Sequence, residues 1–540
     1  MKKIFYFLGL ALLFVHLSMQ AQAPNYLWAQ KSGSVNGISI SAMTVDASGN
    51  SYITGTFRRT VTIAGTLLDA GSGSGMFLAK YDANGNAVWA KKAVGNDSIL
   101  PQAIAVDANG DVYVGGGFYA TTFTMNSVTL TNSDASTTFT DDFVLKFNSS
   151  GTALWGNKYF SNNFGNDYVF DLALDSNGNV VLVGGNHDTV TSSRNIFVEK
   201  VSSTGGFLWY KSISGTVTDY ANKVSVDSNG YIYVSGIYNS PSLTIGSTTY
   251  TNAGGYDMFL IKYDSAGNLI WSKSIANVND ISPLGMNVDN SGNLYLNGYF
   301  NSPNIAFGAT TLTNPGTGLY SYFLVKYDSN GNLLWAIKPN GGNTTANGEL
   351  AVDGFGNCFF IGRYTANFVM GSTNFNNAGG QDIFVAHYNS SGTFIWAKTI
   401  GSTLDDYSAE IALGPNGNCH VTGNFLSDSL TFGTTVLTNQ GNDPSFTEYF
   451  LTKLDNTNLA MSQFAQDSSV FKLYPNPVQN QFELSSALNI EKVEVYSMLG
   501  QLVKSFPMQN QYEVSDLKKG SYLVKVTSGE TSESKMILID

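Results

Sequence analysis

Tryptophan is confined to one position of a repeat that recurs along most of the chain. The spacing between successive tryptophans is 54 to 66 residues. A period of this size predicts supersecondary units that stack on their neighbours to bury their apolar faces. The tryptophan spacing therefore constrains the architecture more tightly than any other feature, although it names no ligand. The residues concerned are Trp28, Trp89, Trp155, Trp209, Trp271, Trp335 and Trp396.

Each repeat contains two predicted hairpins and therefore four strands. In the fourth copy the first hairpin spans residues 224–236, and the second spans residues 257–273 and ends in the tryptophan segment. Both turns have the form Asp-x-x-Gly-Asn or a close variant. Glycine supplies the positive φ of a short hairpin loop, and Asp or Asn bonds its own backbone. The turn glycines are Gly49, Gly85, Gly110, Gly151, Gly178, Gly205, Gly230, Gly267, Gly292, Gly331, Gly356, Gly392 and Gly417.

The predicted strands are apolar at nearly every position, for example in residues 231–234 and 323–325. This pattern indicates strands that are buried on both faces. Four-stranded antiparallel units covered on both sides by similar units predict the blades of a β-propeller.

The number of hairpins predicts how the ring closes. The first hairpin occurs seven times but the second only six, because residues 449–453 are followed by neither the turn glycine nor a tryptophan. The strand around Trp28 would supply the missing strand, so we expect a seven-bladed ring closed by the N-terminal strand. Residues 459–461 are the alternative source of that strand.

Over residues 26–455 the repeats resemble the bacterial seven-bladed β-propeller repeat family, often written SBBP. The resemblance rests on the motifs Val-Asp-x-x-Gly-Asn-x-Tyr-Val-x-Gly and Phe-Leu-x-Lys-Tyr-Asp-x-x-Gly-Asn-x-x-Trp. It implies the fold and says little about function, since propellers carry out many tasks.

The N-terminal segment has the features of a secretory signal peptide. Lys2 and Lys3 precede an apolar run, and small residues follow it, which predicts cleavage after Ala23 with Ala21 as the alternative. The run is shorter than the ~20 residues that a membrane span needs. No second apolar stretch of membrane length occurs in the sequence, so we expect no transmembrane segment in the mature chain.

Residues 471–540 lack the tryptophan repeat and are much richer in charge, and their alternating strands predict a small, Ig-like β-sandwich. This tail resembles the type A C-terminal sorting domain of type IX secretion substrates. The resemblance implies partners in the type IX machinery and a sortase-like peptidase that removes the domain. It also implies a secreted product, free or attached to the cell surface. The motif residues are Tyr474, Pro475, Asn476, Pro477, Gly500, Gly520 and Lys535.

The expected organisation is therefore a signal peptide at 1–23, a propeller at 24–461, a linker at 462–470 and a sorting domain at 471–540. The formal net charge of −12 argues against a nucleic-acid partner. The three histidines after the signal peptide (His187, His387 and His420) do not have metal-ligand spacing, so we expect no metal and no cofactor. Asp107 to Asp111 resembles the start of a calcium loop but lacks its position-twelve acid, so we interpret it as a turn.

The topology predicts where a binding site would lie. In an antiparallel blade, the first and third strands begin on the face where the second and fourth strands end. Length variation is confined to the loops of that face, and such loops commonly carry binding residues. One repeat position at the start of the first strands reads Ala42, Ala103, Asp171, Lys223, Gly285, Glu349 and Glu410. Because the first strands are innermost, we expect the carboxylates at this position to converge at the mouth of the central channel. The candidate ligand-binding residues are Arg58, Arg59, Asp171, His187, Asp188, Glu349, Arg363 and Glu410.

No nucleophile elbow, phosphate loop or metalloprotease motif is present. We therefore expect a non-enzymatic, extracellular or cell-surface binding or adhesion module with a glycan or protein ligand. The alternatives are a propeller enzyme that degrades polysaccharide or peptide, with Glu349 and Glu410 as an acid–base pair, and a structural component of the surface layer or matrix.

Overall fold

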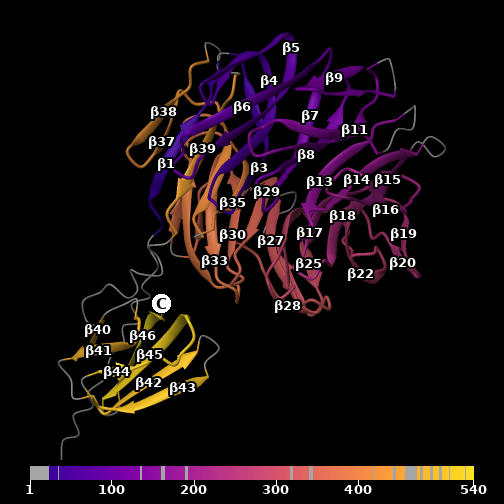
Figure 1. The fold of residues 1–540 in the computed structure, drawn as a ribbon. Coiled ribbons are helices and arrows are strands. Elements are labelled where there is room, and N and C mark those ends of the chain that lie inside the picture. Colours follow the sequence, from indigo (N-terminus) through magenta and orange to yellow (C-terminus); the bar gives the residue numbers. More distant parts are fainter. Residues whose placement is uncertain are drawn as a thin grey trace, which may run out of the picture. The chain divides into compact units, whose positions relative to one another are not determined.

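The chain folds into two compact units, Met1–Leu459 and Ala460–Asp540 (Figure 1). The predicted signal peptide apart from Ala23, the predicted linker and the alternative closing strand at 459–461 lie outside the described residues. All regular elements of the described residues are β-strands. The computed structural model describes residues 23–34, 36–133, 137–159, 165–188, 193–314, 316, 320–339, 344–371, 373–415, 417–441, 446–456, 471–474, 478–486, 490–497, 501–509, 511–528 and 531–539.

The first strands of the repeats form the inner wall of a closed ring. Each contacts the first strand of the next sheet, and the last contacts the first of the series, so the larger unit is a β-propeller. The inner strands are β3 (Ile38–Val45), β7 (Ile99–Val106), β13 (Tyr168–Leu174), β17 (Asp219–Val226), β23 (Ile281–Val288), β29 (Thr344–Val352) and β35 (Asp406–Leu413).

The second and third strands form the middle of each antiparallel sheet. Seven of these fourteen strands are buried at every residue, as their uninterrupted apolar pattern predicts. The second strands are β4 (Ser51–Ile63), β8 (Val112–Phe118), β14 (Val180–Asp188), β18 (Ile232–Tyr238), β24 (Leu294–Phe300), β30 (Cys358–Tyr364) and β36 (Cys419–Phe425). The third strands are β5 (Thr66–Tyr81), β11 (Asp141–Phe147), β15 (Ser193–Val201), β21 (Asp257–Tyr263), β27 (Ser321–Tyr327), β33 (Asp382–Tyr388) and β39 (Glu448–Leu454).

The fourth strands form the outer edge, and one of them comes from the other end of the unit. β1 pairs antiparallel with β39, with Trp28 opposite Lys453, so the predicted pairing of these two strands is observed. The backbone N–H of Asp455 donates to the carbonyl of Asn25 (2.9 Å), which rebuilds a hairpin turn from two separate segments, here called the divided turn. The fourth strands are β1 (Tyr26–Lys31), β6 (Ala87–Gly95), β12 (Ala153–Asn157), β16 (Phe207–Ile213), β22 (Leu269–Ile275), β28 (Leu333–Ile337) and β34 (Phe394–Ile400).

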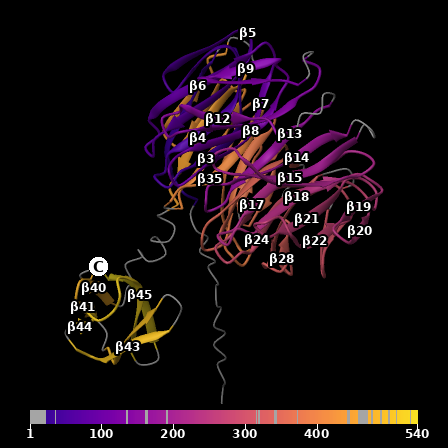
Figure 2. The ribbon, with the colours of Figure 1, turned by 45° about the vertical axis from the view of Figure 1, so that its right-hand side comes forward.

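Short strands between the second and third strands extend the outer rim. The β9 strand also pairs with β6 of the preceding sheet and so protects part of an exposed edge. The sheet β13–β14–β15–β16, of which Figure 2 labels β13, β14 and β15, has no such hairpin among its described residues. These short strands are β9 (Thr122–Met125), β10 (Val128–Thr131), β19 (Ser242–Ile245), β20 (Thr248–Thr251), β25 (Asn304–Phe307), β26 (Thr310–Thr313), β31 (Phe368–Met370), β32 (Thr373–Phe375), β37 (Ser429–Phe432) and β38 (Thr435–Thr438). A further short strand, β2 (Gly33–Ser34), lies between β1 and β3 and pairs with β4.

The face that carries the Asp-x-x-Gly-Asn turns, here called the turn face, has nearly the same structure in every sheet. All thirteen predicted turn glycines have positive φ, from 71° to 84°. In the first turn, Asp46 Oδ1 accepts from the backbone N–H groups of Ser48 and Asn50, both at 2.9 Å. The turn interpretation of this motif is therefore confirmed.

Tryptophan joins each sheet to the next on the turn face. Trp271 Nε1 donates to the carbonyl of Ser329 in the following sheet (3.3 Å), and Lys262 Nζ donates to the same oxygen (2.8 Å). The indole also covers the next turn glycine, as Trp209 covers Gly267. Six tryptophans donate this hydrogen bond, each to the next sheet. This contact between sheets explains why tryptophan recurs once in each repeat.

Trp396 is the exception because the sheet beyond it contains the divided turn. Its Nε1 finds no partner among the described residues, and its side chain is buried. His387 replaces the repeat lysine beside it and stacks on Phe359, with ring centroids 4.3 Å apart. Lys398 instead donates to the carbonyl of Pro24 (2.7 Å) and holds the N-terminal strand in place.

The smaller unit is built from two sheets around its own apolar core. The strand orders are β40–β41–β44 and β43–β42–β45–β46. Val493, Val495, Val524 and Ile537 are buried in this core. The strands are β40 (Phe471–Tyr474), β41 (Gln481–Ser486), β42 (Lys492–Ser497), β43 (Leu502–Pro507), β44 (Tyr512–Glu513), β45 (Gly520–Ser528) and β46 (Thr531–Ile539).

Candidate functional site

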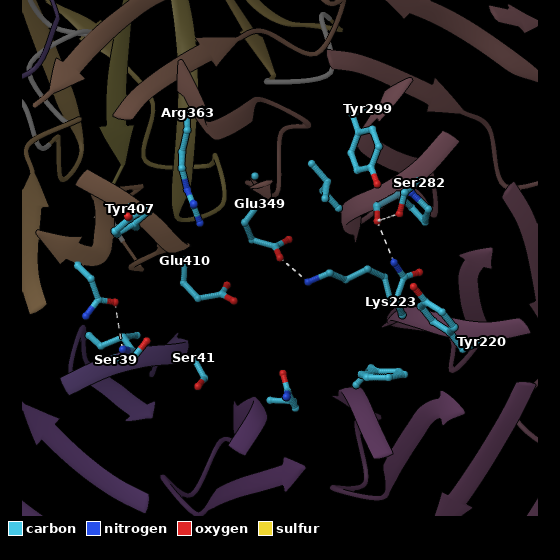
Figure 3. A pocket seen from close by; sticks show the side chains of 18 of the residues that line it. Ser39, Ser41, Tyr220, Lys223, Ser282, Tyr299, Glu349, Arg363, Tyr407 and Glu410 are labelled. Atoms are coloured by element: carbon cyan, nitrogen blue, oxygen red, sulfur yellow. Dashed lines mark hydrogen bonds and ion pairs between the residues drawn. The ribbon is translucent and has the colours of Figure 1, made fainter. Parts of the chain in front are cut away.

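A cavity of about 870 Å³ opens where the inner strands begin, on the face opposite the turns. We call this face the mouth face and the space the mouth cavity (Figure 3). Its walls come from the starts of first and third strands and the ends of second strands, as the topology predicts. Side chains from every sheet of the ring contribute, so the cavity belongs to the ring as a whole.

A β-bulge near the start of the inner strands directs side chains into this cavity. The strand register shifts at one equivalent place in six inner strands: β3, β7, β13, β17, β23 and β35. A bulge inserts one residue and re-aims its side chain. Five of the six inserted residues line the mouth cavity: Ser41, Gln102, Phe170, Asn222 and Leu284.

The bulge explains a glycine that recurs in the second strands. A Cβ atom on Gly55 would collide with the carbonyl oxygen of Ser39, and one on Gly236 would collide with that of Tyr220. In β30, whose partner β29 has no bulge at this place, a Cβ on Gly362 would meet the ring of Phe384 instead. The repeated glycine is therefore required by the close approach of the bulged strand.

The repeat position predicted to converge at the channel does so. Asp171, Lys223, Glu349 and Glu410, from four different sheets, line a smaller space of about 180 Å³ that adjoins the mouth cavity, here called the floor. Gly285 leaves room for Glu349, because a Cβ there would collide with the Glu349 carboxylate.

Lys223 and Glu349 form an ion pair across the channel (Figure 3). Glu349 Oε1 also accepts from the backbone N–H of Leu350 (3.0 Å). Burial raises the pKa of Glu410, and the nearby Glu349 carboxylate raises it further. Burial also raises the pKa of Asp171 to about 6, although Lys223 opposes this shift. The floor therefore holds one ion pair beside two carboxyl groups, Asp171 and Glu410, whose pKa values are raised by burial.

Two arginines and several aromatic rings form the upper wall of the mouth cavity. The Arg363 guanidinium lies 5.1 Å from the ring centroid of Tyr407 and extends into the cavity (Figure 3). Arg194 lies 5.4 Å from the Tyr168 ring and 5.9 Å from the Phe170 ring. Such stacking fixes the plane of a guanidinium.

Arg194 and the rings of Phe170, Tyr220, Tyr299 and Tyr407 were not among the residues predicted from sequence. Arg194 lies at the start of a third strand, whereas the prediction drew only on first and second strands. One repeat position, three residues before the predicted column, carries Tyr168, Tyr220 and Tyr407, and this regularity would have revealed the aromatic wall.

The remaining candidates are distributed over the mouth face. Arg58 lines a neighbouring cavity of about 530 Å³, here called the side cavity, which shares Ser39 and Thr447 with the mouth cavity. Arg59 is exposed, has φ of 54° and lines neither cavity.

His187 does not line the mouth cavity. His187 is half-buried, and its backbone N–H donates to Asp167 Oδ1 (2.8 Å). Asp188 ends β14, and its side chain lies outside the described residues. The charges predicted at the ends of the second strands are thus divided: Arg363 and Arg58 line cavities, whereas Arg59 and His187 line neither.

The other two histidines are buried. Burial lowers the pKa of His387 to about 4 and that of His420 to about 3, so both rings are neutral near pH 7. His420 Nδ1 lies 2.8 Å from Ser51 Oγ. Within the described part of the chain, no group of three or more His, Cys, Asp or Glu side chains is placed to hold a metal ion.

The processing and sorting residues are only partly described. Ala23 is half-buried against the core of the closing sheet. Tyr474 ends β40 and is exposed, Gly520 begins β45, and Lys535 lies on β46. Pro475, Asn476, Pro477 and Gly500 lie outside the described residues. No helix in the described ranges is long and apolar enough to cross a bilayer.

Comparison with known families identifies the tail. Residues 472–540 match the family described as secretion system C-terminal sorting domain. The match indicates type IX secretion to the cell surface or extracellular space and interaction with that secretion machinery.

Two curated relatives are each 25% identical to parts of the chain. The uncharacterized WD repeat-containing protein L264 of Acanthamoeba polyphaga mimivirus aligns over 358 residues, 53% of this chain and 26% of that protein. Regulatory protein FlaEY of Caulobacter vibrioides aligns over 228 residues, 41% of this chain and 23% of that protein. The chain thus spans about a quarter of the length of these relatives.

Among solved structures, the β-propeller domain of the Trilobed protease from Pyrococcus furiosus is similar, with 8% identity and a TM-score of 0.37. The alignment covers 76% of this chain and 99% of that chain. The assignment of the larger unit as a propeller rests on its own sheet order and ring of contacts.

Proposed function

We propose that this protein is an extracellular or cell-surface binding module whose ligand, a glycan or a protein, enters the mouth cavity. The proposal includes a seven-bladed, SBBP-type propeller over residues 24–461, closed by its N-terminal strand. It also includes an N-terminal signal peptide and an Ig-like sorting domain at 471–540 that a sortase-like peptidase removes. A non-enzymatic role, with no cofactor, fits the predominance of structural repeats.

One observation carries this proposal. Charged and aromatic side chains that depart from the repeat gather around one cavity of about 870 Å³, while the opposite face repeats the same turn in each sheet. A concave site with convergent polar groups and rings is the usual form of a ligand site. Structural repetition alone gives no reason for Lys223, Glu349, Arg194 and Arg363 to meet there.

The direct test is a glycan-array and protein-binding screen of the purified full-length chain. Arg363→Gln and Arg58→Gln should each weaken binding of the ligand that the screen identifies. Arg59→Gln is the matched control, because Arg59 neighbours Arg58 but lines neither cavity. Binding that survives changes in both cavities would contradict the proposed site.

Export has its own test. Deletion of residues 471–540 should leave the propeller in the periplasm of a host with the type IX pathway, measured by fractionation and immunoblotting. Normal secretion of the shortened chain would remove the basis for the sorting role. A periplasmic, thermally stable propeller would show that the loss lies in sorting and not in folding.

A second candidate is a hydrolase or lyase at the same site. Glu349 is ion-paired with Lys223, while burial raises the pKa of Glu410, and carboxyls with such different environments are typical of acid–base pairs. Turnover of a polysaccharide or peptide, abolished by Glu349→Gln and by Glu410→Gln, would support an enzyme. A third candidate, a matrix component, predicts self-assembly without any ligand.

A further inference from the structure

We propose that the mouth and side cavities together bind an acidic polysaccharide, a polymer that carries a carboxylate on its sugar rings. This inference rests on the proposed binding function and assigns its ligand class. The argument uses the placement of arginine, the rings around it and the charge of the cavity walls.

Arginine is rare in this chain and is concentrated at the two cavities. Of four arginines, Arg194 and Arg363 line the mouth cavity and Arg58 lines the side cavity. The cavities share Ser39 and Thr447, so a single extended ligand can contact all three. Guanidinium groups match carboxylates in geometry and bind them through two hydrogen bonds.

Arg58 and Arg194 are open to an external anion. Arg194 packs over the rings of Tyr168 and Phe170, which fixes its plane. Within the described residues, neither Arg58 nor Arg194 forms an ion pair with a carboxylate. A carboxylate from a ligand would therefore not have to displace a protein carboxylate from these two groups.

The charge of the mouth cavity also favours an anion. Its walls carry three cationic side chains, Arg194, Arg363 and Lys223, against two carboxyl groups, Glu349 and Glu410. Burial and Glu349 raise the pKa of Glu410, which favours its neutral form. The local balance is therefore positive, although the chain as a whole is acidic. Screening limits the long-range repulsion at physiological salt.

The rest of the lining suits a sugar better than a peptide. Phe170, Tyr220, Tyr299 and Tyr407 offer aromatic surfaces for the C–H faces of pyranose rings. Amide and hydroxyl side chains, among them Gln102 and Asn222, can bond to sugar hydroxyls. Aliphatic anchors, by which peptides dock in grooves, are few in this cavity.

The test is calorimetric titration of the full-length chain with an oligogalacturonate, an oligomannuronate, the methyl ester of the oligogalacturonate and poly-glutamate. We expect at least one of the two acidic oligosaccharides to bind, and its affinity to fall as salt rises. The ester keeps the sugar but removes the charge, so the oligogalacturonate and its ester form a matched pair. The ester should bind about tenfold or more weakly than the acid.

Variants locate the site on the protein. Arg194→Gln and Arg363→Gln should each weaken binding by about tenfold or more. Arg58→Gln should weaken binding of long oligomers more than short ones, because only a long chain reaches the side cavity. Arg59→Gln should bind like the unchanged protein. Thermal unfolding of each variant separates loss of contact from loss of fold.

Several outcomes would overturn the assignment. Equal affinity for acid and ester would indicate a neutral glycan, and comparable affinity for poly-glutamate would indicate an acidic peptide. If neither acidic oligosaccharide binds to the folded, unchanged protein, the proposed ligand class is rejected. In each case the proposed binding function still holds if the array screen finds another ligand whose binding is abolished by Arg363→Gln.

Discussion

The two faces of the propeller are built from the same strands but follow different rules. On the turn face, six tryptophans bond to the following sheet and thirteen glycines take the same backbone conformation. On the mouth face, one repeat position holds alanine, glycine, aspartate, lysine or glutamate. The repeated residues of the turn face are therefore those that stacking of the sheets requires. The variable residues of the mouth face are those that can differ to suit a ligand.

Loss of the closing strand should have the largest effect. Deletion of residues 24–31 removes β1, leaves β39 as an open edge and deprives Ala83 of its bond from Trp28. We expect the melting temperature to fall by about 10 °C or more, measured by calorimetry. Deletion of residues 471–540, the control, should leave the propeller transition in place. Equal melting of both shortened chains would refute the role of β1.

The bulge beneath the mouth face should be nearly as sensitive. In Gly55→Ala the new Cβ would collide with the Ser39 carbonyl, so we expect a loss of at least about 3 kcal/mol in the free energy of unfolding. Gly73→Ala is the control, because the nearest atom to its Cβ lies 3.9 Å away. Denaturant titration measures both. Similar values for the pair would mean that the bulge relaxes freely.

A matched pair of turn glycines separates backbone strain from packing between sheets. Gly65 and Gly267 have φ of 72° and 81°, and an alanine at Gly65 meets nothing within 4 Å. Gly65→Ala should cost about 1 kcal/mol through strain alone. Gly267→Ala should cost about 1 kcal/mol more, because its Cβ lies 3.0 Å from the Trp209 ring. Equal costs would show that the indole contact adds nothing.

The histidine that marks the divided turn should make stability depend on pH. Burial lowers the pKa of His387 to about 4, so the unfolded chain takes up its proton first as pH falls below about 6.5. Its contribution is complete above that pH and is lost toward pH 4, at up to about 1.4 kcal/mol per pH unit. His387→Phe should flatten this part of the stability curve. An unchanged slope in thermal melts from pH 7 to 5 would contradict the assignment.

The smallest effect on stability should come from a mouth-face arginine. Arg58 is exposed, so Arg58→Gln should change the free energy of unfolding by no more than about 0.5 kcal/mol. A ligand-binding change without a stability change would sharpen the contrast between the two faces. A large loss of stability would place Arg58 among the structural residues.

The parts of this molecule that the sequence predicted are those set by local chemistry and repetition. The positive φ at Gly267, the pairing of the Trp28 strand with residues 449–453, and the meeting of Glu349 with Glu410 all follow from counting equivalent positions. Each depends only on knowing that successive units are alike.

What sequence reasoning missed depends on where individual side chains point. The bulge between Ile40 and Ala42 changes the direction in which the side chains of β3 point. Its only trace in the sequence is Gly55 on the neighbouring strand. Arg194 was overlooked because its role comes from stacking on Tyr168 and Phe170 of another strand. His187 was expected at the site, but it lies near the end of β14 and lines neither the mouth cavity nor the side cavity.

The divided turn also has a consequence for how the molecule is made. Thr452 Oγ1 donates to the carbonyl of Trp28 across a sequence separation of 424 residues. The first strand to be synthesised, β1, therefore stays unpaired until nearly the whole unit, including β39, has been synthesised. Pairing across such a separation is slow, although its entropic cost grows only with the logarithm of length. Before this strand pairs, the sheets form an open array in which each is stabilised only by its neighbours. Once the ring is closed, the sheets unfold together.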